Sequence, residues 1–120
     1  MNENEYRPVH WMGSSRKDLK AFPKDVRNKI GVALSVAQLG GKHHRAKPLQ
    51  GFGSGVLEIV SDYDGDTYRA VYTVRLVHGI YVLHCFQKKS KHGIKTSQKE
   101  IDLIRQRLNQ AIEQDRNTKE

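Results

Sequence analysis

The sequence predicts an α+β fold in which an N-terminal helical hairpin and a C-terminal helix pack on a small, mainly antiparallel sheet. Apolar residues recur at helical spacing in residues 26–37 and 101–112. Between them, three strand-like runs are separated by Asp64-Gly65 and His78-Gly79, pairs that favour tight hairpin turns. The length of 120 residues suits one domain. We expect residues 1–120 to form it, with 113–120 a frayed polar tail.

The first half of the chain predicts a short strand and two helices. Residues 7–12 are a strand candidate, and Ser14 or Ser15 can cap the first helix. Pro23 suits the first position of the second helix, which Gly40-Gly41 ends. The apolar face of the second helix consists of Val26, Ile30, Ala33, Leu34 and Ala37. Residues 40–55 are rich in glycine and basic residues, and they predict a loop.

The second half predicts a three-stranded meander and a final helix. The expected strands are residues 56–63, 66–77 and 80–87. Ser97 and Glu100 form an S-x-x-E capping box at the start of the last helix. The apolar face of that helix consists of Ile101, Ile104, Leu108 and Ile112.

Strand alternation places two arginines on one face of the sheet. Arg69 and Arg75 share a face, while Tyr68, Ala70 and Tyr72 share the other, which we expect the helical hairpin to cover. Arg69 can bind a phosphate, or it can form a salt bridge with Glu58 or Asp62 on the adjacent strand. The sequence leaves both possibilities open.

The charge of the chain indicates an acidic partner. Lys and Arg total 21 against 13 Asp and Glu, for a formal net charge of +8. Such an excess is typical of proteins that bind nucleic acid, ribosomes, membrane surfaces or acidic proteins. A basic protein that is merely soluble is the alternative.

Several other classes are disfavoured. No apolar run approaches the ~20 residues of a membrane span, and residues 1–11 have no signal-peptide core, so we expect no membrane association. The one cysteine, Cys85, allows no internal disulfide and fits a reducing cytoplasm. Its spacing from the histidines at 43, 44 and 84 does not suit tetrahedral zinc. We therefore expect no metal and no cofactor.

The most informative segment is a basic cluster after the third meander strand. The strand ends near Phe86 and is followed by a lysine-rich stretch that contains Lys88, Lys89, Lys91, His92 and Lys95. Such a cluster at the end of a packed strand suits a polyanion. Lys91 and Lys95 are expected to steer phosphate, and solvated charge is their alternative. A second basic group, His43, His44, Arg45 and Lys47, is expected to contact RNA or the ribosome, with a solvated loop as its alternative.

Three segments carry a resemblance to a known family. The chain resembles the RelE/ParE toxin superfamily in its order of elements and in two segments, YRAVYTVRL and FQKKSKHGIKTSQKEI. A third segment, LEIVSDY, is similar to a strand of the HigB-like, phage-derived-protein branch of that superfamily. The resemblance implies a RelE-like sandwich and the toxin of a type II toxin–antitoxin system. It also implies a cognate antitoxin, expected to be a helix-turn-helix protein. Many members cleave messenger RNA in the ribosomal A site, whereas the ParE arm inhibits DNA gyrase.

The resemblance assigns roles to individual residues. Arg69 matches the arginine at the scissile phosphate, Lys88 and Lys89 match the paired lysines, and Phe86 matches the aromatic before them. Glu58 matches the polar position of the first meander strand. Cleavage through the RNA 2′-hydroxyl needs a base, positive charge and a proton donor. Either lysine could supply the base if neighbouring cations lower its pKa. His92 or His84 is the competing proton carrier.

Three classes of function therefore remain. The favoured one is a cytoplasmic, metal-independent endoribonuclease that acts on mRNA at the ribosome, in which Arg75 and Phe86 also contact RNA. The alternatives are a ParE-like gyrase inhibitor and a non-catalytic basic nucleic-acid-binding module, for which affinity would fall steeply with salt.

Overall fold

The computed structural model describes residues 6–88 and 96–119. Its elements, in chain order, are β1 (Val9–Trp11), α1 (Ser15–Lys20), α2 (Lys24–Gln38), β2 (Ala46–Pro48), β3 (Val56–Tyr63), β4 (Asp66–Thr73), β5 (Ile80–Lys88) and α3 (Gln98–Asn117). The strands form a single sheet in the order β1-β5-β4-β3-β2. Only β1 and β5 pair in parallel, and the other neighbours are antiparallel. The predicted α+β class with a mainly antiparallel sheet is confirmed.

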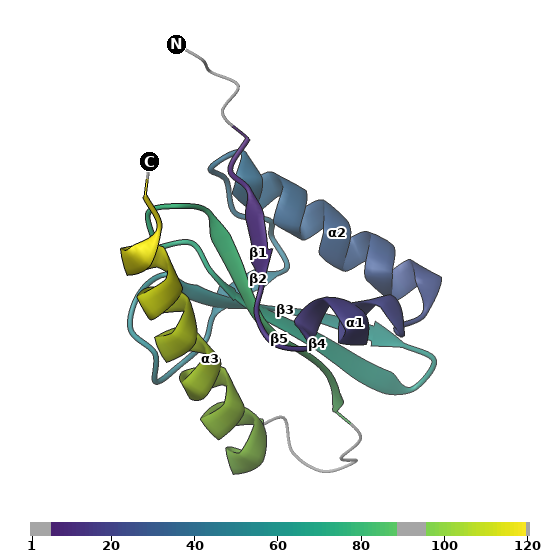
Figure 1. Cartoon of the computed structure of the whole chain (residues 1–120). Helices are drawn as coiled ribbons and strands as arrows, with labels where there is room; N and C mark the ends of the chain where they lie inside the picture. The colour runs from purple at the N-terminus through teal and green to yellow at the C-terminus, as the bar shows by residue number, and fades with distance from the viewer. Residues whose placement is uncertain (1–5, 89–95, 120) are drawn as a thin grey trace.

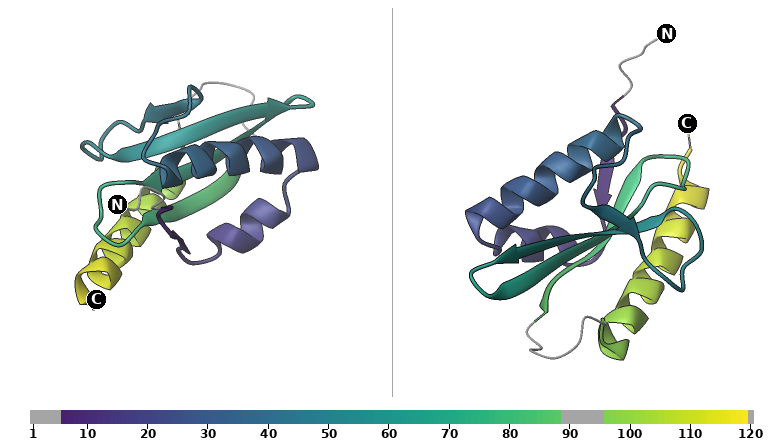
Figure 2. Two further views of the ribbon diagram at one scale, coloured as in Figure 1. Left: turned by 90° about the horizontal axis from the view of Figure 1, so that it is seen from above. Right: turned by 180° about the vertical axis from the view of Figure 1, so that it is seen from behind.

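Helices cover both faces of this sheet (Figures 1 and 2), with α1 and α2 on one side and α3 on the other. The first core packs α2 against Tyr68, Ala70 and Tyr72 of β4, as the alternation along that strand predicts. The second core packs Ile104 and Leu108 of α3 against the opposite face of the sheet. Helix α3 covers only part of this face. Side chains of β3 and β4 that point to the uncovered part can therefore line a functional site.

The connection between β4 and β5 differs from the prediction. We expected a strand to residue 77 and a two-residue hairpin, but β4 ends at Thr73. Arg7 donates to the carbonyl oxygens of Val74, Leu76 and Gly79 at 3.1, 2.7 and 3.2 Å. The Asp115 carboxylate accepts from the backbone N–H groups of Val77 and His78 at 2.9 and 2.8 Å. Because these side chains satisfy the backbone polar groups, the connection does not need a strand ladder.

The predicted loop of residues 40–55 contains a strand, so that prediction was partly wrong. Strand β2 pairs with β3 and aligns Ala46 with Ile59 and Lys47 with Glu58. Ala46 is buried in the core under α2, which anchors the strand despite its short length. Its neighbour Lys47 points to the face that α3 covers only in part.

The C-terminal helix begins as predicted but extends further. The Ser97 hydroxyl accepts from the Glu100 backbone N–H at 3.5 Å, whereas the Glu100 carboxylate binds His84 rather than completing the capping box. We expected fraying from residue 113, but α3 runs to Asn117 and Asp115 is buried. The expectation of a frayed tail is corrected over these residues.

The N-terminal elements follow the prediction with small shifts. Strand β1 is shorter than residues 7–12, and Pro23 lies just before α2 rather than at its first position. Ser14 precedes α1, but its hydroxyl donates to the Asp18 carboxylate at 2.7 Å instead of capping the backbone. In the part of the chain that the structure describes, no helix combines the length and apolarity needed to cross a membrane.

Candidate active site

The centre of the candidate site is an ion pair on the α3 side of the sheet. Arg69 lies on β4 opposite Val60, and Glu58 lies two residues earlier on β3, so both side chains emerge from the same face. The Arg69 Nη1 atom lies 2.8 Å from the Glu58 Oε1 atom. The two side chains are 9% and 16% exposed, respectively. The salt bridge that the sequence allowed between these residues is therefore present.

The pair lines an open cleft of about 510 Å³, which we call the Arg69 cleft. One wall comes from β2 and the residues after it, and another from the beginning of α3. The lining residues are Lys47, Pro48, Leu49, Gln50, Glu58, Arg69, Thr96 and Ile101. Apolar surface beside a charged pair suits a nucleotide, which has a flat base and an anionic phosphate.

Two lysines add positive charge near the pair. Lys47 lies directly opposite Glu58 in the β2–β3 register. Lys88 lies opposite Thr67, on the strand that places Phe86 opposite Arg69. Partial burial, and then the neighbouring Arg69 guanidinium, lower the pKa of Lys88, while Glu58 opposes that shift. The lowered pKa favours proton transfer by this amine.

The arrangement can therefore carry out three chemical tasks. The guanidinium of Arg69 can bind phosphate oxygens, since its planar fork matches their geometry. The Glu58 carboxylate can accept a proton, and the Lys88 ammonium can donate one. These are the groups that 2′-hydroxyl attack on a phosphodiester needs.

The aromatic residue of the predicted site is part of the core. Phe86 is buried on the α3 side and stacks on His84, with ring centroids 4.6 Å apart. The His84 Nε2 atom lies 2.6 Å from a Glu100 oxygen, and its Nδ1 atom lies 3.3 Å from Arg107 Nη1. His84 is thus a satisfied buried histidine, and Phe86 packs against it rather than presenting an open face.

Arg75 lies apart from the Arg69 cleft. It follows β4 and donates to the carbonyl oxygens of Phe52 and Ser54 at 3.2 and 3.1 Å. These bonds hold the loop before β3 in place. The structure therefore gives Arg75 a structural contact and does not bring it to Arg69.

The basic group at residues 43–47 is divided between two faces of the molecule. Lys47 lines the Arg69 cleft, whereas His43, His44 and Arg45 line a separate pocket against α2. Four further predicted site residues lie outside the described residues: Lys89, Lys91, His92 and Lys95.

The sequence did not identify several residues of the cleft. Gln50, Thr96 and Ile101 line it because β2 and the start of α3 converge on the same face of the sheet. The pairing of β2 with β3 carries the necessary information, but a strand of three residues within a glycine-rich stretch has no detectable alternation. Ile101 was assigned to the apolar face of the last helix, and its place at the cleft depends on how that helix docks.

The fold and this site are those of a small basic protein with a charged cleft on one face of an antiparallel sheet. Residues 17–109 match the family model of the Gp49-like phage-derived proteins (DUF891), and the chain belongs to this family. The family comprises proteins assigned as toxins of toxin–antitoxin systems, related to RelE and HigB, and it implies an antitoxin as partner. Neither the curated proteins nor the solved structures compared with the chain gave a match.

Proposed function

We propose that this toxin is an endoribonuclease that cleaves mRNA on the ribosome through the RNA's own 2′-hydroxyl. The observation that carries the proposal is the Arg69–Glu58 pair at 2.8 Å, set in a cleft of about 510 Å³. The site combines Arg69, which can bind phosphate, Glu58, which can accept a proton, and the nearby Lys88 amine, whose pKa is lowered. A module that only bound nucleic acid would need the positive charge but not a carboxylate beside it.

Substrate binding activates the base in this scheme. The scissile phosphate competes with Glu58 for the guanidinium of Arg69 and so releases the carboxylate. Glu58 then accepts the 2′-hydroxyl proton as the 2′-oxygen attacks phosphorus, and Arg69 stabilises the charge that develops on the phosphoryl oxygens. The bond from phosphorus to the 5′-oxygen breaks, and Lys88 protonates that oxygen. The products are a 2′,3′-cyclic phosphate and a 5′-hydroxyl end.

The rest of the cleft positions the substrate. Lys47, opposite Glu58, lies where it can bind an adjacent phosphate. Pro48, Leu49 and Ile101 provide apolar surface for a base. The net charge of +8 attracts the RNA and the ribosome over longer distances.

The test is cleavage mapping in a coupled translation reaction, with purified RNA alone as the comparison. Wild-type protein is expected to produce new 5′-hydroxyl ends at fixed positions within codons, and only when ribosomes are present. Arg69→Lys keeps the charge but loses the planar fork, and Glu58→Gln removes the base. Each change is expected to reduce cleavage by about 100-fold or more.

The matched control is Arg16→Lys, the same chemical change at an exposed arginine on α1, away from the cleft. It should cleave like wild type, and circular dichroism should show that all three variants are folded. Intact message with translation stalled would refute cleavage and indicate a ribosome binder. Intact message with normal translation would refute the proposal and direct attention to another target, such as gyrase.

A further inference from the structure

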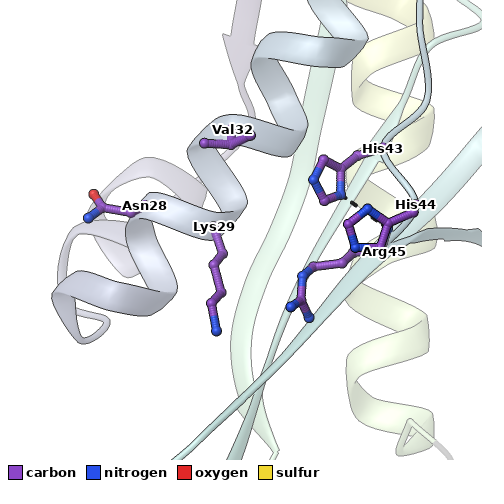
Figure 3. A pocket seen from close by; sticks show the side chains of 6 residues that line it. All are labelled: Asn28, Lys29, Val32, His43, His44 and Arg45. Carbon is purple, nitrogen blue, oxygen red and sulfur yellow. Dashed lines mark hydrogen bonds between the residues drawn. The ribbon is translucent and has the colours of Figure 1, made fainter.

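A second basic site lies on the opposite side of the sheet from the Arg69 cleft. A pocket of about 220 Å³ is formed between α2 and the chain that returns along it, and we call it the α2 pocket. Its lining residues are Asn28, Lys29, Val32, His43, His44 and Arg45 (Figure 3). The function proposed above uses none of these residues.

The chain before β2 fixes His43 and places His44 beside it. The His43 carbonyl accepts from the Ala46 N–H at 2.9 Å, and its Nδ1 atom accepts from the Arg45 N–H at 3.1 Å. The rings of His43 and His44 lie with centroids 4.3 Å apart and an interplanar angle of 30°. The turn therefore holds the His43 imidazole at the pocket, with the His44 ring packed beside it.

The pocket combines apolar surface with unneutralised positive charge. Val32 is 55% exposed, although valine on a helix is usually turned toward a core. Lys29 and Arg45 extend toward the same side, while His43 faces Val32 (Figure 3). Among the described residues, neither Lys29 nor Arg45 forms an ion pair.

The electrostatics of His43 agree with this picture. Its pKa is lowered by desolvation first, and then by the positive charges of His44 and Arg45. Cations gathered around an apolar centre repel one another, and an anionic partner would relieve that repulsion.

We propose that the α2 pocket is a docking site for an acidic segment of a partner protein, which inserts one apolar side chain beside Val32 and pairs its carboxylates with Lys29 and Arg45. The family implies an antitoxin, and an acidic antitoxin segment has the required chemistry. The inference depends on that family partner and not on the endoribonuclease proposal.

Size and layout favour a protein segment over other ligands. A volume of about 220 Å³ lies below the roughly 300–1,000 Å³ of pockets that enclose small molecules, and it suits a single side chain. An apolar centre with a charged rim is the usual anatomy of a protein interface. Single-stranded RNA is instead bound along a groove where cations and stacking surfaces follow the backbone.

The test is a nuclear magnetic resonance titration of the ¹⁵N-labelled full chain with the peptide Ac-Glu-Glu-Leu-Glu-Glu-NH₂. Shifts are expected at the Val32 amide and the His43 imidazole, and the His43 pKa should rise when the carboxylates bind. Replacing the central leucine of the peptide with glycine should weaken binding about tenfold. A peptide with lysines in place of the glutamates should not bind.

Variants with matched controls locate the site. Lys29→Glu and Val32→Asp should each weaken peptide binding about tenfold or more. Arg27→Glu and Leu39→Asp are the matched controls: they reverse a charge and replace an apolar side chain at exposed positions of α2 and its C-terminal end that do not line the pocket. Binding should change less than about twofold. Folding of each variant is checked in the same spectra.

Three outcomes would overturn the proposal. They are the absence of shifts at Val32 and His43, equal effects of the pocket variants and their controls, and hexauridylate RNA binding at the pocket in preference to the peptide. Because cleavage is not measured, failure here leaves the endoribonuclease proposal untouched. Unchanged cleavage in the Arg69 and Glu58 variants would count against the endoribonuclease site and would likewise leave the docking proposal untouched.

Discussion

Replacing Asp115 with asparagine tests how the end of α3 is attached to the sheet. The Asp115 carboxylate accepts four hydrogen bonds: from the backbone N–H groups of Val77 and His78, from the His78 ring and from the Tyr81 hydroxyl. Asp115 is 6% exposed. The Val77 N–H bonds one carboxylate oxygen, and the other three donors bond the other oxygen. Asparagine keeps only one acceptor oxygen and is neutral, so its NH₂ group loses the donors on one side and the contacts on the other side weaken.

The pKa of Asp115 gives the magnitude. Burial raises the pKa, but the four hydrogen bonds outweigh it and lower the pKa from 3.8 to about 2. At about 1.4 kcal/mol per pH unit, this lowering corresponds to about 2 kcal/mol of stability. A group whose pKa is depressed in the folded state stabilises the protein above its unfolded pKa. The contribution is therefore complete at pH 7, and it disappears as the pH falls from about 4 to about 2.

Urea and thermal denaturation monitored by circular dichroism measure the effect. At pH 7, Asp115→Asn should lower the free energy of unfolding by about 2 kcal/mol and the melting temperature by roughly 8 °C. Near pH 2 the difference from wild type should shrink toward zero. The control is Glu113→Gln, which breaks a pair with Arg116 whose side chains are 61% and 68% exposed. That change should cost less than about 0.5 kcal/mol.

Equal stability of the two variants at pH 7 would refute this role of Asp115. A cost of Asp115→Asn that does not change between pH 7 and pH 2 would refute it as well. In either case the carboxylate would not hold the β4–β5 connection in solution, and the C-terminal turn of α3 would fray as its polar sequence predicts.

Three other expectations can be checked with the same protein. Tyr81→Phe removes one donor to Asp115 and should cost about 1 kcal/mol of unfolding free energy in urea melts. Gly55→Ala should cost at least about 1 kcal/mol in the same assay, since Gly55 has φ of +85° and an added Cβ would lie 2.8 Å from the Arg75 Cβ atom. An unchanged urea melt would show that glycine is not required at this position. Burial raises the pKa of the Cys85 thiol to about 12, so mass spectrometry should show iodoacetamide labelling at pH 8 only after denaturation.

Short sequence patterns correctly predicted the features that depend on neighbouring residues in the chain. Alternation along residues 66–73 separates Tyr68, Ala70 and Tyr72 from Arg69, and the structure places them on opposite faces. The Asp64-Gly65 turn, which ends β3, follows from the preference of that pair for positive φ. These features need no information from distant parts of the chain.

The wrong predictions for the β4–β5 connection and for the end of α3 depend on contacts between distant residues. Strand β4 ends early because Arg7 and Asp115, from the two ends of the chain, bind the backbone of the connection after it. The same carboxylate keeps the last turn of α3 helical. A local pattern cannot contain such information, since each side chain is ordinary in its own segment. Arg7 looks like one more surface cation, and Asp115 like part of a polar tail.

The candidate site was predictable to the extent that strand geometry determines it. The sequence paired Glu58 with Arg69 as one of two alternatives, and register alone brings them together. Gln50 and Thr96 could not be found in this way, because they reach the cleft from β2 and from the start of α3. Arg75 was assigned to the same face as Arg69, but the strand ends before it.

The two basic surfaces have different electrostatic designs, and this difference bears on what each can bind. In the Arg69 cleft the Glu58 carboxylate is already paired with the Arg69 guanidinium, so a phosphate must displace it. The phosphate gains affinity only by the amount that its interaction with Arg69 is more favourable than the ion pair that it replaces. In the α2 pocket no carboxylate is paired with Lys29 or Arg45 among the described residues, so an acidic partner meets no competitor. The sheet separates the two surfaces. A partner bound at the α2 pocket would therefore leave the Arg69 cleft open. To inhibit the proposed cleavage, such a partner would need a second segment that reaches the Arg69 cleft, or it would have to block binding to the ribosome.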